Sequence, residues 1–90
     1  MTDKGLAMDD GPPEDLEARL RWLEGQAEAA YSAMYDAPAG SALAARYSDA
    51  KEFLHDAIAL ANRLGNAAVA DRLSRRLDAI KTIFRSQFPG

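Results

Sequence analysis

The sequence contains no cysteine, which excludes disulfide bonds and thiolate metal sites and is typical of a reducing compartment. It also lacks the run of roughly 18 apolar residues that a membrane-spanning helix requires. Residues 1–11 carry three aspartates and no apolar centre, unlike a secretory signal peptide. We therefore expect a soluble, cytoplasmic protein that makes no contact with membranes.

The β-branched residues that favour strands are scarce, whereas alanine, leucine, arginine and glutamate, which favour helices, are abundant. A chain of 90 residues corresponds to one domain. A domain of this size buries only about 60–70% of the surface that its unfolded chain exposes, so we expect modest stability. Association with another chain would add to this stability.

The most regular segment lies between residues 43 and 64, where apolar residues recur at alternating steps of four and three. This spacing places them on one face of a helix for about six turns. We predict a helix over residues 41–64, capped by Ser41 or, if it begins at Pro38, by Asp36. Its apolar face consists of Leu43, Tyr47, Ala50, Leu54, Ala57, Ala61 and Leu64.

The same spacing occurs on both sides of this segment. Pro12 and Pro13 have the backbone angle of a helix start, and they predict a first helix over residues 13–36. Gly65 suits a left-handed helix end and Asn66 suits an N-cap, so they predict a third helix over residues 67–87. The apolar positions of these two helices are Leu16, Leu20, Leu23, Ala27, Ala30 and Met34, and Ala70, Leu73, Leu77, Ile80 and Phe84.

These patterns predict an all-α fold in which three long antiparallel helices form an up-down-up bundle, because short connections join neighbouring antiparallel helices. The bundle would occupy residues 12–90 as a single domain. Residues 1–11 would form a flexible acidic tail, since they have too few apolar groups to offset the entropy lost on ordering.

No catalytic or metal-binding pattern stands out. Glu52 and His55 have the Glu-x-x-His spacing of metal sites in helical bundles, but both fall on the face opposite the apolar one, whereas such sites project inward. No serine lies in a nucleophile motif, and no glycine-rich phosphate loop occurs. We expect no catalytic residue, no metal site and no cofactor.

Charge is distributed unevenly along the chain. Residues 1–40 hold three basic and nine acidic groups, whereas residues 61–90 hold six basic and two acidic groups. The third helix therefore has a basic surface that can contact nucleic acid or an acidic partner. The net charge of −3 and the acidic first helix favour pairing within the protein instead, so we do not expect nucleic acid to bind. This basic surface comprises Arg72, Arg75, Arg76, Lys81 and Arg85.

A second face of the first helix consists of small residues around the only tryptophan. Small side chains allow another helix to approach closely, and tryptophan is a frequent anchor of protein interfaces. This small-residue face is equally consistent with self-association and with a broad contact inside one chain. Its residues are Ala18, Trp22, Gly25, Ala29 and Ala33.

Residues 47–58 resemble the second helix of a tetratricopeptide repeat, with Tyr47, Ala50, Leu54 and Ala57 at the expected intervals. The similarity covers about a dozen residues. Pro38 falls where the preceding helix of that repeat would run, and no second copy follows. We therefore transfer no binding residues from this family.

Taken together, the sequence predicts a small non-enzymatic helical protein that self-associates, as a homodimer, and acts as a binding or assembly module with possible protein partners. The alternative is a regulator that contacts nucleic acid or an acidic partner through the basic surface of the third helix.

Overall fold

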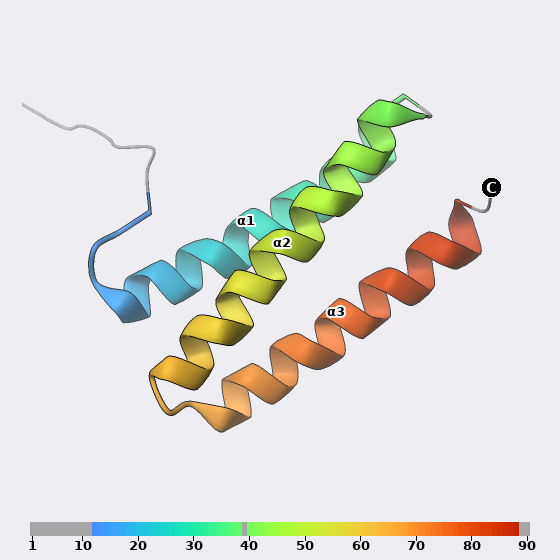
Figure 1. Cartoon of the computed structure of the whole chain (residues 1–90). Coiled ribbons are helices and arrows are strands. Elements are labelled where there is room, and N and C mark those ends of the chain that lie inside the picture. The colour runs from blue at the N-terminus through green and yellow to red at the C-terminus, as the bar shows by residue number, and fades with distance from the viewer. Residues whose placement is uncertain (1–11, 39, 89–90) are drawn as a thin grey trace, which may run out of the picture.

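Three helices make up most of the computed structural model, which describes residues 12–38 and 40–88. They are α1 (Leu16–Asp36), α2 (Ser41–Arg63) and α3 (Ala67–Gln87). The helices run up, down and up, with short connections between them (Figure 1). This arrangement confirms the predicted all-α fold, and the described residues contain no strand. The predicted acidic tail, residues 1–11, lies outside the described residues.

The start of α1 differs from the prediction by about one turn. The carboxylate of Asp15 accepts a hydrogen bond from the backbone N–H of Ala18 at 2.8 Å, so that the helix begins at Leu16 and not at residue 13. Pro13 lies before the helix, where its carbonyl accepts a hydrogen bond from Nε of Arg19 at 2.9 Å. An acidic cap therefore determines the boundary, and the two prolines only lead into it.

The start of α2 also corrects the sequence-based interpretation. Gly40 occupies the N-cap position with φ 94° and ψ −136°, a conformation open only to glycine, and no side chain caps the helix. The predicted cap at Ser41 or Asp36 is wrong, because Ser41 is already the first helical residue and Asp36 is the last residue of α1. At its other end α2 finishes at Arg63, one residue earlier than predicted.

The turn between α2 and α3 matches its prediction closely. Gly65 has φ 74°, the left-handed conformation expected at a helix end. The side chain of Asn66 accepts a hydrogen bond from the backbone N–H of Val69 at 3.2 Å and caps α3. Together these two residues reverse the chain within a few positions.

The hydrophobic core follows the middle turns of the predicted apolar faces. Of the residues on those faces, Leu16 is 37% exposed, and four others are only half-buried: Leu43, Tyr47, Leu64 and Phe84. Small residues are prominent in the core, so each buried contact removes little apolar surface from water. The buried residues are Leu20, Leu23, Ala27, Ala30, Met34, Ala50, Leu54, Ala57, Leu60, Ala61, Ala70, Leu73, Leu77 and Ile80.

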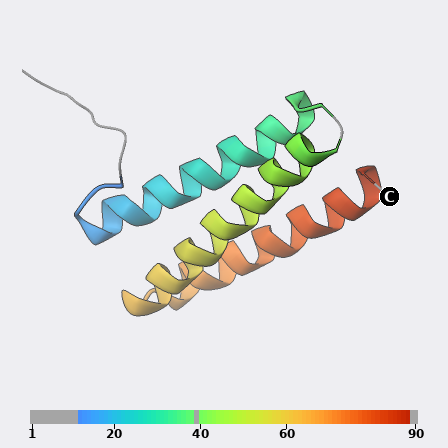
Figure 2. The same ribbon diagram turned by 45° about the horizontal axis from the view of Figure 1, so that its top comes forward.

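The middle helix, α2, packs against both α1 and α3, whereas the backbones of α1 and α3 scarcely approach each other. Figure 2 shows α2 running between its two neighbours. The Cα atoms extend over 47 × 34 × 13 Å, and their radius of gyration is 14.8 Å. A compact chain of this length has a radius of gyration of about 12 Å. The three helices therefore form a broad, thin layer, which leaves little apolar volume far from solvent.

Candidate interaction surfaces

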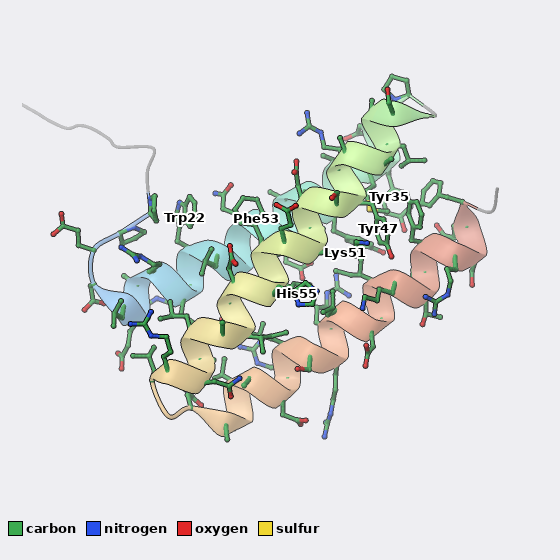
Figure 3. The ribbon with its side chains drawn as sticks, in the orientation of Figure 1. Trp22, Tyr35, Tyr47, Lys51, Phe53 and His55 are labelled. Carbon is green, nitrogen blue, oxygen red and sulfur yellow. The ribbon has the colours of Figure 1, made fainter. Side chains whose placement is uncertain are left out.

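The only tryptophan lies on the outer face of the α1–α2 pair. The ring of Trp22 meets that of Phe53 from α2 edge to face, with ring centroids 5.9 Å apart. Both side chains are half-buried and pack against the hydrophobic core. Figure 3 shows them together on the side of α2 away from α3. The tryptophan thus has a partner in its own chain while part of the pair stays open to solvent.

A shallow groove runs along the same face, between α1 and α2. Its first section has a volume of about 280 Å³ and is lined on the α1 side by Gln26, Ala29, Ala30 and Ala33, and on the α2 side by Arg46, Asp49 and Phe53. A second section of about 290 Å³ continues past Ala33, Asp36 and Arg46 to the α1–α2 connection. We call this feature the alanine groove. Aromatic and alanine side chains form most of its apolar lining.

The predicted small-residue face is therefore divided between two environments. Ala18, Trp22 and Ala33 are half-buried, whereas Gly25 and Ala29 are exposed. A Cβ atom added to Gly25 would have no neighbour within 4 Å. Packing inside the chain consequently gives no reason for a glycine in the middle of a helix, where it costs roughly 0.5–1 kcal/mol relative to alanine.

The basic surface of α3 is partly paired with the acidic side of α1. Arg76 makes two hydrogen bonds to the carboxylate of Glu28, at 2.7 and 2.8 Å, and Arg72 makes one to Glu24 at 3.1 Å. Arg75 pairs within α3, with Asp71 at 2.8 Å. Lys81 is half-buried and Arg85 is exposed on the last turns of α3. The predicted pairing of α1 with α3 is thus present within one chain.

These ion pairs affect the protonation of their members. The hydrogen bond from Arg76, supported by its positive charge, lowers the pKa of Glu28 below its usual value, and partial burial opposes this effect. The same bond raises the pKa of Arg76, which stays charged. Arg76 also lies 4.9 Å from the ring centre of Tyr31, a cation–π contact. Long side chains therefore join α1 and α3 where their backbones do not meet.

A cavity of about 510 Å³ lies under these bridges. Glu24 and Glu28 form one wall, arginines of α3 form the other, and Leu54 and Leu73 form the floor. Charges of both signs line it, and the two carboxylates already engage Arg72 and Arg76. The cavity is a solvated cleft between two helices and shows no arrangement of catalytic groups.

Sequence reasoning missed an aromatic cluster at the end of the layer where α1 ends and α2 begins. Tyr47 and Phe84 stack in parallel with ring centroids 3.7 Å apart, and Lys51 lies 4.3 Å from the centre of the Tyr47 ring. Tyr31 and Tyr35 share a hydrogen bond of 2.9 Å, and Phe88 contacts Tyr35. The labelled side chains of Tyr35 and Tyr47 lie near the end of α3 in Figure 3. The signal in the sequence is the four-residue spacing between Tyr31 and Tyr35 and between Phe84 and Phe88, which places each pair on one side of a helix.

The candidate metal pair does not converge with other ligands. Glu52 and His55 are both exposed on α2. Among residues 12–38 and 40–88, no group of three or more His, Cys, Asp or Glu side chains is arranged to hold a metal ion.

In that same part of the chain, no helix has the length and apolar character to cross a membrane.

Comparison of the chain with models of known protein families, with curated proteins and with solved structures finds no match in any of the three.

Proposed function

We propose that this chain is a small, non-enzymatic, cytoplasmic module that self-associates as a homodimer through the outer face of α1 and α2 and serves in binding or assembly. The observation that supports this proposal is the half-buried Trp22–Phe53 pair beside the alanine groove. Aromatic side chains next to small residues combine a large apolar contact with room for a neighbouring helix. Open space at Gly25 extends that room along α1.

The thin layer provides a second reason for association. The core is rich in alanine, and α2 packs closely on both α1 and α3, which do not pack closely on each other. Small domains with limited cores gain stability when a partner covers more apolar surface, because the free energy of burial scales with area at about 25 cal/mol per Å². A second copy on the outer face of α1 and α2 would cover the remaining surface of Trp22 and Phe53.

The proposal is tested by a charge placed in the groove without disturbing the core. Ala29 is exposed and lines the groove, so Ala29→Arg should leave the helical circular dichroism unchanged and abolish the dimer. Ala79→Arg, at an exposed alanine of α3, is the matched control and should keep the dimer. Equal sedimentation of both variants and the wild type as dimers would contradict the use of this face.

The alternative, a regulator acting through the basic surface of α3, has weaker support. Arg72 and Arg76 already bind carboxylates of α1, so a polyanion would have to displace Glu24 and Glu28 to reach them. Native mass spectrometry with and without a short DNA duplex separates the two functions. Complexes that dissociate as the salt concentration rises would favour the regulator.

A further inference from the structure

We infer that the two ion pairs between α1 and α3 form a salt-sensitive strap over the cavity of about 510 Å³ between these helices, and that the strap opens while the helices stay folded. The strap consists of Arg72 with Glu24 and of Arg76 with Glu28. It is independent of the proposed self-association, because Trp22 lies on the side of α2 away from α3 (Figure 3).

The two pairs of the strap share one register. Each pair joins residues 48 positions apart, and its members lie four residues, or about one turn, from the members of the other pair. α1 and α3 run in the same direction, so the pairs follow one another along the cleft. A shift of α3 by one turn would break both pairs and allow only one new pair among the same four residues. The strap therefore fixes the position of α3 along α1.

Contacts between uncharged groups hold α3 on either side of the strap. The turn at Gly65 joins the start of α3 to α2, and near its end Phe84 stacks on Tyr47 with ring centroids 3.7 Å apart. Release of the strap therefore requires rotation of two arginine side chains and no separation of the helices. Side chains in contact with solvent make such rotations within picoseconds to nanoseconds.

The floor of the cavity is closed to water while the strap is in place. Leu54 and Leu73 line the cavity, yet they are only 1% and 2% exposed. The side chains of the strap are between 25% and 59% exposed. Arginine side chains cover apolar surface with their methylene groups while the charged end stays in contact with water. Rotation of Arg72 and Arg76 into solvent would therefore uncover Leu73.

Salt distinguishes the strap from the rest of the packing. The Debye length is about 30 Å at 0.01 M salt and about 3 Å at 1 M, which is close to the distances of 2.7–3.1 Å within the pairs. High salt should thus weaken the strap and leave the apolar contacts in place. Arg75 also lines the cavity, but it pairs with Asp71 of its own helix at 2.8 Å and adds nothing to the link with α1.

The absence of cysteine allows access to the cavity to be measured at single positions. Leu73→Cys is treated with iodoacetamide, an uncharged reagent, at salt concentrations from about 0.01 to 1 M. We expect the labelling rate to rise roughly 2- to 30-fold, the range that the loss of two exposed ion pairs allows. Leu54→Cys reports on the same cavity from α2. Ile80→Cys, at a position of α3 that is 0% exposed and does not line the cavity, should change less than about twofold.

Removal of the two carboxylates tests the strap itself. In the Leu73→Cys chain, Glu24→Gln together with Glu28→Gln should give rapid labelling at low salt and a rate that no longer depends on salt. Glu52→Gln, at an exposed position of α2, is the matched control and should keep the salt dependence. The helical circular dichroism of all these variants should stay constant over the salt range.

Two results would overturn the inference. Labelling rates of Leu73→Cys and Leu54→Cys that stay constant from low to high salt would show that the ion pairs do not control access to the cavity. Equal rises for Leu73→Cys and Ile80→Cys would show that salt loosens α3 as a whole and that no separate strap exists.

Discussion

At the scale of single residues, the neighbours Leu54 and His55 should differ sharply in their contribution to stability, because Leu54 is buried and His55 is exposed. Leu54 is 1% exposed, so Leu54→Ala should lower the free energy of unfolding by about 2–5 kcal/mol through the cavity that it leaves. His55→Ala should change it by less than about 0.5 kcal/mol. Urea denaturation of both variants measures the two values. Comparable losses would mean that the core lies on another face of α2.

Gly25 provides a prediction in which stability and association change in opposite directions. Since a Cβ atom there meets nothing within 4 Å, Gly25→Ala should raise the free energy of unfolding of the dilute chain by roughly 0.5–1 kcal/mol. The same methyl group would fill part of the open space on the proposed dimer face and weaken the dimer. Denaturation at low concentration and sedimentation at high concentration test the two effects. A destabilised monomer would show that its own fold needs the glycine.

The periodicity of apolar residues is enough to predict most of the core. It does not predict where a helix begins or which aromatic side chains of different helices stack. Alternating steps of four and three identified nearly all the buried positions, because a helix repeats its faces every 3.6 residues. The two prolines before α1 predict a helix start at residue 13, whereas the carboxylate of Asp15 caps the helix and sets its start at Leu16. The aromatic cluster around Tyr47 and Phe84 was missed because stacking between helices depends on their relative register, which periodicity does not contain.

At the scale of helices, the caps differ in a way that mutation can measure. Asp15 and Asn66 each accept a backbone hydrogen bond at a helix start, so Asp15→Ala and Asn66→Ala should each cost about 0.5–2 kcal/mol. Ser41 caps nothing, and Ser41→Ala should stay within about 0.5 kcal/mol of the wild type. Thermal unfolding followed by circular dichroism compares the three. A loss at Ser41 as large as at Asp15 would restore Ser41 as a cap.

The ion pair between α1 and α3 predicts a dependence on pH. The pKa of Glu28 is lowered in the folded chain, so its contribution to stability is fully present above the usual value of 4.5 and is lost as the pH falls through the lower folded pKa. Glu28→Gln should therefore be less stable than the wild type near neutral pH, by up to about 1 kcal/mol for an exposed pair. The difference should shrink as the pH falls below about 4.5.

Urea denaturation of the wild type and Glu28→Gln from neutral pH downward checks this prediction. Glu17→Gln is a suitable control, because Glu17 is an exposed acidic residue on the first turn of the same helix. A difference between the wild type and Glu28→Gln that stays constant down to the lowest pH would show that the lowered pKa of Glu28 contributes nothing to stability.

At the scale of the whole molecule, the layer is thinner than the bundle that the sequence predicts. The opposite charges of the chain ends predicted that α1 and α3 would pair, and the bridges from Arg72 and Arg76 agree. The sequence did not predict that the two backbones would stay apart, because the angles between helices depend on all the packed side chains together. This geometry leaves Trp22 and Phe53 half-buried on the outer face of α1 and α2, beside the alanine groove.

The central claim is that this outer face brings two copies together, and sedimentation equilibrium of the wild-type chain over a range of concentrations tests it most directly. We predict a mass near twice the 9.8 kDa of one chain at concentrations on the order of tens of micromolar, falling toward 9.8 kDa on dilution, as expected for micromolar affinity. The emission of Trp22 should shift to longer wavelength over the same range, because dissociation exposes it. A constant mass of 9.8 kDa with unchanged emission would contradict the claim.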